Sequence, residues 1–151
     1  MTWLRSKKTL VLTLVCLVVV ALLGALVVAG MHARTMATTL RFEVVTDEAK
    51  QNLGLGNRAE IPDNYAMLFV FPEKARYGFW MKDMLVPIDI TWLNDDGTIL
   101  LVDHGVSPST YPEVFYPPVP VKYVLETRAG YATAHNWEEG TKVALPAPYG
   151  I

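Results

Sequence analysis

The sequence predicts a mainly β domain, an antiparallel sandwich or barrel with one or two short helices, preceded by one N-terminal transmembrane helix or signal segment. Two observations carry this prediction. Short apolar or alternating segments recur along residues 39–151, separated by turn-forming residues, as in all-β folds. Residues 9–29 form a run of 21 residues without a charge. As a helix, that run would span the roughly 30 Å hydrocarbon core of a bilayer.

The flanks of the apolar run predict its orientation. Three basic residues precede it and Arg34 follows it, which favours an N-terminus in the cytoplasm and a domain outside it. The alternative is a cleaved signal, since small residues at 27–30 offer a cleavage site, although the run exceeds the roughly 7–15 residues usual for signals. We therefore expect a single-pass membrane protein, with 9–29 in the membrane, or a secreted or periplasmic one. The four predicted parts are a basic cytoplasmic N-terminus (1–8), an anchor or signal segment (9–30), a tether (31–38) and a single extracytoplasmic domain (39–151).

Charge and cysteine content exclude several function classes for the domain. It carries nine basic and 15 acidic residues, a net charge of −6, which argues against nucleic acid as a partner. The only cysteine, Cys16, lies in the apolar run, so no disulfide holds the domain. His32, His104 and His135 have no close histidine or cysteine companion, so we expect no metal, the alternative being a site assembled from distant carboxylates. Residues 54–59 match a dinucleotide-binding pattern in form, but a helix is expected before them and Pro62 follows, so we expect no cofactor.

The first half of the domain alternates strands with one helix. Residues 40–45 alternate apolar and polar side chains, as in a half-buried strand. Thr46 or Asp47 can cap a helix that runs to Leu53 and ends at Gly54. Residues 65–71 are apolar on both faces, which is typical of a central strand, and 77–82 predict a further strand.

The second half begins with a hairpin. In 88–93 every second residue is apolar, so Ile88, Ile90 and Trp92 should face the core and Asp89 the opposite side. Residues 107–120 hold five prolines in 14 positions, which predicts an extended loop rather than a helix or inner strand. The other predicted elements are a turn at 94–97, strands at 98–106, 121–127 and 141–145, and a helical turn at 130–137.

Lys82 leads to the candidate site. It follows Trp80 by two residues on a predicted strand, so both side chains share one face. An unpaired buried ammonium would cost several kcal/mol, so Lys82 either reaches water or meets a carboxylate. Asp89 and Glu126 are the natural partners, because each interrupts an apolar strand. Two interpretations stay open: a structural ion-pair network, or a ligand-binding or catalytic cluster.

Seven segments resemble those of a known family, in the same order: "LGLGNR" (53–58), "MLFVF" (67–71), "FWMKDMLVPIDI" (79–90), "DDGTIL" (95–100), "YVLE" (123–126), "AG" (129–130) and a final "W-x-x-G-x-x-V" (137–143). Together they resemble the domain of unknown function 192 family, small mainly β proteins of bacteria and archaea. The likeness covers about 42–145. It implies a fold and a motif, but no activity. The motif positions carried over are Gly54, Arg58, Trp80, Met81, Lys82, Pro87, Asp89, Pro117, Tyr123 and Glu126; Ala66 and Asp83 depart from the usual pattern.

These residues predict a binding or accessory module for a small polar ligand, a glycan or a peptide. We expect a groove where Trp80 and Asp89 meet the loop 107–120, with Arg58 and Lys82 facing an anionic group while Trp80 and Tyr111 stack on the ligand. One alternative is an enzyme with Asp89 or Glu126 as general acid or base and Lys82 tuning its pKa. Another is a protein-interaction module through 107–120. The candidate ligand-binding residues are Arg58, Trp80, Lys82, Asp89, Tyr111, Tyr123 and Glu126.

Overall fold

The structure is a computed structural model, and it describes residues 39–150. The chain divides into two compact units, and Thr39–Ile151 is the second of them. The predicted apolar segment and tether, 9–38, lie outside the described residues. Of the helices that the structure describes, none has the length and apolar character needed to cross a membrane.

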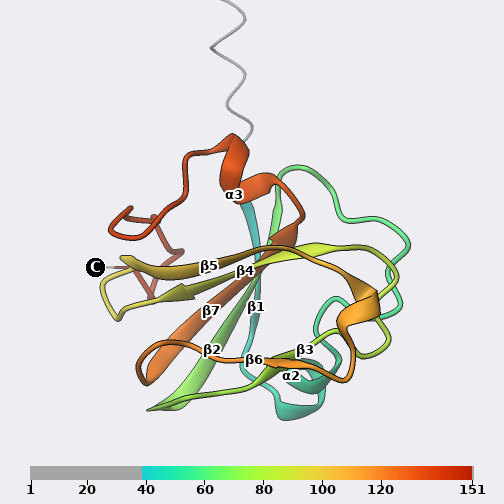
Figure 1. Cartoon of the computed structure of the whole chain (residues 1–151). Helices are drawn as coiled ribbons and strands as arrows, with labels where there is room; N and C mark the ends of the chain where they lie inside the picture. The colour runs from blue at the N-terminus through green and yellow to red at the C-terminus, as the bar shows by residue number, and fades with distance from the viewer. Residues whose placement is uncertain (1–38, 151) are drawn as a thin grey trace, which may run out of the picture. The chain divides into compact units, whose positions relative to one another are not determined.

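A five-stranded sheet is the centre of the domain (Figure 1). Its order is β1-β2-β7-β4-β5, and a separate two-stranded ribbon pairs β3 with β6. The strand bounds are β1 Arg41–Val45, β2 Tyr65–Ala75, β3 Phe79–Trp80, β4 Ile88–Leu93, β5 Ile99–Val106, β6 Val114–Phe115 and β7 Val121–Arg128.

The prediction of a mainly β fold with short helices is confirmed, but the sheet is open and mixed rather than a closed or fully antiparallel one. β1 runs parallel to β2, while the β2–β7, β7–β4 and β4–β5 pairs are antiparallel. A parallel pair requires a crossover of a dozen or more residues. The 19 residues between β1 and β2, which include the first helix, supply that crossover. In the strand order β1 and β5 are the two edges, so the sheet does not close.

Two α-helices and one 3-10 helix accompany the strands: α2 (Glu48–Leu53), α3 (Tyr131–Ala134) and η1 (Pro108–Thr110). α2 confirms the predicted cap, because the Asp47 side chain accepts a hydrogen bond from the Lys50 amide at 3.1 Å. η1 corrects the prediction that 107–120 holds no helix. Its proline stands at the first position, where the missing N–H has no intrahelical acceptor.

The predicted closing strand at 141–145 is wrong. Only Lys142 forms a β-bridge, with Thr98. The Val143 amide donates instead to the Gly97 carbonyl in the turn between β4 and β5, at 2.9 Å. This segment thus covers the turn and adds Val143 and Leu145 to the core without extending the sheet.

Both faces of the sheet are covered by apolar side chains. Ile88, Ile90 and Trp92 of β4 belong to one core cluster, and Leu93 to the other, so the predicted alternation is confirmed. Glu126 of β7 pairs in register with Met67 on one side and Ile90 on the other, both members of the first cluster. Because cross-strand partners share a face, a carboxyl group lies among the apolar side chains of the first cluster.

Candidate functional site

A cavity of about 480 Å³ borders the first face of the sheet, between α2 and the residues around β3. This volume lies in the range of small-molecule sites. Its walls combine aromatic side chains with a few polar ones. The aromatic residues are Phe71, Tyr77, Phe79 and Trp80; the polar ones are Thr46, Glu48, Gln51, Asn52, Lys82 and Glu126.

The aromatic wall is held by ring contacts. Phe71 and Tyr77 stack with centroids 3.6 Å apart and planes 10° apart. Phe79 meets Trp92 edge to face at 5.1 Å, which ties β3 to the core beneath it. Trp80 follows on the same wall and is 39% exposed, so its indole is accessible to a ligand.

The opposite wall is α2, and Gln51 fixes it to the sheet. Its side-chain amide donates to the carbonyls of Val45 and Val70, at 3.3 Å and 3.1 Å. The helix has no buried residue of its own. These two hydrogen bonds therefore connect the α2 wall to the last residue of β1 and to the middle of β2.

Glu126 is the innermost charged residue of the cavity lining. It is 4% exposed, and its Oε2 has no hydrogen-bond partner among residues 39–150. Burial raises the pKa of Glu126 to about 8, although the Leu55 backbone and the Arg58 charge act in the opposite direction. The carboxyl group is therefore mostly protonated at neutral pH, when it can both donate and accept a hydrogen bond.

Gly54 leaves the space that this carboxyl group occupies. Its φ of +53° lies in the left-handed region, where side chains other than glycine are disfavoured. A Cβ atom at this position would lie 3.1 Å from Glu126 Oε2 and 3.6 Å from the Phe69 ring. The glycine that ends α2 thus serves the site as well as the helix.

The structure does not join Lys82 to Asp89 and Glu126 in the predicted network, and it holds Arg58 away from the cavity lining. Lys82 is exposed on the cavity lining, and no ion pair among the described residues joins it to Asp89 or Glu126. Arg58 lies outside the lining; its guanidinium donates to Glu43 at 3.1 Å and to the Tyr65 hydroxyl at 2.9 Å. The hydrogen bond from Tyr65 and the Arg58 charge lower the pKa of Glu43.

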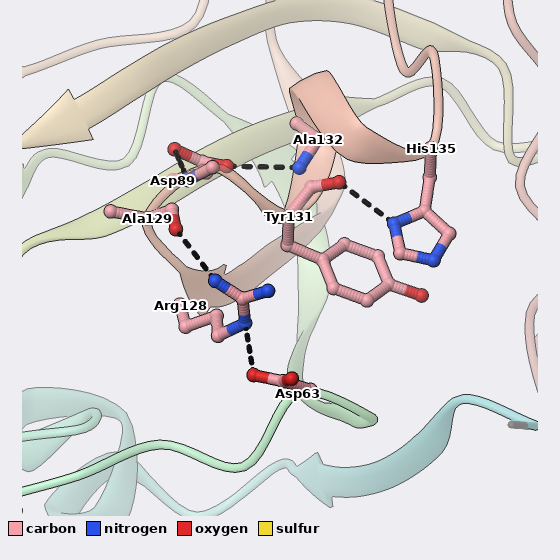
Figure 2. Close-up of polar contacts among 8 residues, drawn as sticks. Asp63, Asp89, Arg128, Ala129, Tyr131, Ala132 and His135 are labelled. Atoms are coloured by element: carbon pink, nitrogen blue, oxygen red, sulfur yellow. Dashed lines mark hydrogen bonds and ion pairs between the residues drawn. The ribbon is translucent and has the colours of Figure 1, made fainter.

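Asp89 is fully buried at a different place, beside α3 (Figure 2). Its Oδ1 accepts from the amides of Gly105 at 2.8 Å and Gly130 at 3.2 Å, and its Oδ2 accepts from Ala132 at 2.9 Å. These three amides engage both carboxylate oxygens, so the residue joins β5 and α3 to β4. Asp89 is not among the residues that line the cavity.

Two predicted aromatic residues also lie elsewhere. Tyr123 packs with the second core cluster, on the other face of the sheet, and its ring meets Tyr149 at 6.3 Å. Tyr111 follows η1 and is half exposed. With Tyr116 and Val119, it makes the loop 107–120 apolar on its surface.

The α2 wall and the Phe71–Tyr77 pair of the cavity were not predicted from the sequence. The sequence signal for this pair was that Phe71 directly precedes Pro72 and Tyr77 follows it by five residues, on either side of a turn. No three His, Cys, Asp or Glu side chains within 39–150 lie close enough to hold a metal ion.

Comparisons with known proteins agree on the fold. A crystal structure from Sinorhizobium meliloti, described as that of "a putative transcription regulator", is 29% identical over 68% of this chain and 79% of its own, with a TM-score of 0.65. A protein of unknown function from Novosphingobium aromaticivorans is 26% identical over 70% of this chain and 75% of its own, with a TM-score of 0.66. No curated protein matches the chain.

The family comparison agrees with the motifs seen in the sequence. The model of the family described as "Uncharacterized ACR, COG1430" matches residues 30–145, which is more than half of the chain. Glu126, Gly54 and Lys82 all lie within the matched range. The protein therefore belongs to the DUF192 family.

Proposed function

We propose that the domain is a binding module for a small organic ligand, with the cavity beside α2 as its site. The observation that carries the proposal is the Glu126 carboxyl group, buried on the cavity lining with Oε2 unpartnered. A buried polar atom without a partner costs roughly 1–3 kcal/mol, and a ligand that supplies the hydrogen bond recovers part of that cost.

The walls indicate the form of the ligand. Tyr77, Phe79 and Trp80 offer flat apolar surface, and Leu53 adds aliphatic surface from the end of α2. Such a lining suits a molecule with an aromatic or aliphatic body and one polar group directed at Glu126. Lys82 stands among the lining residues but is exposed to solvent, so it contributes less than a buried charge would.

A thermal-shift screen of the purified full chain against small organic molecules tests the proposal. A ligand at 100 times its Kd should add about 2.7 kcal/mol to the free energy of unfolding. Trp80→Ala should weaken binding, whereas Tyr111→Ala, which alters an exposed aromatic residue outside the cavity lining, should not. Equal losses in the two variants would rule out this cavity as the site.

A second candidate function is an enzyme with Glu126 as general acid or base. It is favoured by the pKa of Glu126, raised by burial to about 8, because acid–base catalysis works best with a group that titrates near the working pH. Glu126→Gln should then abolish turnover of any substrate found. If the protein is only a binder, the same variant should change affinity and no turnover should be measurable in the wild type.

We also propose that residues 9–29 tether the domain to the cell membrane, with the domain outside the cytoplasm. The support is the uncharged 21-residue run and the three basic residues before it. Cell fractionation separates this proposal from the cleaved-signal alternative. An uncleaved anchor leaves the full-length protein in the membrane fraction after a carbonate wash, whereas cleavage releases a shorter form.

A further inference from the structure

We infer that the ligand of this cavity is a cationic amine on an apolar or aromatic body, with its ammonium group seated at the Glu126 carboxyl. The inference rests on the proposed function and names the ligand class. It departs from the anionic ligand expected from the sequence, because the residues that were to bind the anion lie elsewhere or are exposed.

The distribution of charge is the first argument. Two carboxyl groups, Glu48 and Glu126, line the cavity against one ammonium, Lys82, so the lining becomes negative once a bound cation displaces the proton of Glu126. The acid is the buried member of this set, and the lysine is exposed. Arg58 contacts Glu43 and Tyr65 instead of the lining. The domain as a whole carries a net charge of −6, which favours cations over anions as its partners.

The chemistry of the walls is the second argument. A protonated amine has three N–H donors, and Glu126 Oε2 is an acceptor without a partner. Ammonium–carboxylate hydrogen bonds are about twice as strong as neutral ones. Phe79, Tyr77 and Trp80 supply ring surface on the same lining, and ring faces attract cations, with tryptophan the strongest.

Binding of an ammonium group should release a proton. The free carboxyl group holds its proton at pH 7; beside a bound cation its O–H bond breaks and the proton passes to the buffer. The neighbouring β2 and β4 residues, Met67 and Ile90, are apolar. Among the described residues, the other titratable groups of the cavity lining are Glu48, Lys82 and Tyr77, and Arg58 acts on Glu126 from beyond the lining.

The affinity for an amine should then rise with pH. Because the ionised carboxylate is the form that binds, the association constant should increase by up to about tenfold per pH unit between pH 6 and 8. The increase should level off once Glu126 is ionised in the free protein.

Isothermal titration calorimetry on the full chain, with three probes of one shape and different charge, tests the inference. The probes are phenethylamine, 2-phenylethanol and 3-phenylpropionate. We expect phenethylamine to bind at least about tenfold more tightly than the other two, with close to one proton released when buffers of different ionisation enthalpy are compared. Glu126→Gln should remove this preference, and Lys82→Gln should keep or increase it.

The outcomes distinguish the inference that the ligand is a cation from the proposal that the cavity binds a small molecule. Tighter binding of the alcohol or the carboxylate would overturn the cation inference while leaving a small-molecule site in place. Failure of all three probes to bind would overturn the cation inference, and the thermal-shift screen then decides separately whether the cavity is a small-molecule site. The wild-type series decides the question by itself, so it does not depend on the folding of a variant. A Phe-Gly-Gly amide with a free amino terminus, compared with its acetylated form, then shows whether a peptide terminus can supply the same ammonium.

Discussion

Glu126→Gln should change how the stability of the domain depends on pH. Burial raises the pKa of Glu126 from its ordinary 4.5 to about 8. Below pH 4.5 the group is protonated in the folded and unfolded chain alike, so it makes no difference to stability. Between pH 4.5 and 8 the folded state holds the proton that the unfolded state loses, and stability falls as the pH rises.

The pKa change sets the magnitude. A rise of about 3.5 pH units, at 1.36 kcal/mol per unit, corresponds to a loss of about 5 kcal/mol above pH 8 and about 3 kcal/mol at pH 7. This is a large share of the 5–15 kcal/mol that stabilises a typical domain. Glutamine has nearly the same shape and no charge. The variant should therefore gain on the wild type by about 3–4 kcal/mol in total from pH 5 to 8.

Urea unfolding of both proteins, followed by tryptophan fluorescence at pH 5, 6, 7 and 8, measures this difference. Groups whose folded pKa is lowered, such as Glu43 and Asp96, act in the opposite direction, but they are present in both proteins and cancel in the subtraction. A difference that stays constant within about 0.5 kcal/mol over this range would refute the assignment of Glu126 as a buried neutral acid.

Three further substitutions test the parts around the cavity. Gly105→Ala should cost about 1–2 kcal/mol, and Gly54→Ala should cost more, because both positions have positive φ but only Gly54→Ala places a methyl group against Glu126. Equal losses of stability in urea unfolding would contradict this crowding. Asp89→Asn should lower the free energy of unfolding by about 2–3 kcal/mol, because the side-chain nitrogen of asparagine cannot accept a hydrogen bond from a backbone amide. It should leave the affinity for a ligand unchanged, and a loss of binding in calorimetry would place Asp89 in the site. Lys82→Ala should shift stability by less than about 0.5 kcal/mol, and a larger loss would reveal a buried partner.

Most of the strands could be predicted because their side-chain periods are local properties of the sequence. The exceptions are the closing strand expected at 141–145, which is absent, and the strand expected over 77–82, which is only Phe79–Trp80, so that Lys82 lies in the following turn. The alternation in 88–93 placed Ile88, Ile90 and Trp92 on one core face, and the structure confirms it. The way β1 returns to β2 could not be predicted, since strand pairing depends on contacts far apart in the chain. The choice between an open mixed sheet and a closed antiparallel one therefore required the structure.

The candidate site was only partly predictable for the same reason. Glu126, Trp80 and Lys82 interrupt or flank apolar segments, and all three line the cavity. The same signal also marked Asp89, because a charge in an apolar strand indicates burial without indicating which groups surround it. In the fold its neighbours are three backbone amides, which belong to segments that the strand pattern could not bring together.

Carbon-13 NMR of the Glu126 side-chain carboxyl, assigned by comparison with Glu126→Gln, tests the central claim most directly. In the free protein the resonance should titrate with a midpoint near pH 8. Saturating phenethylamine should move that midpoint downward, because the bound ammonium favours the carboxylate. A midpoint between pH 4 and 5 in the free protein, or no response to the amine, would contradict the account of a buried neutral acid that receives a cationic ligand.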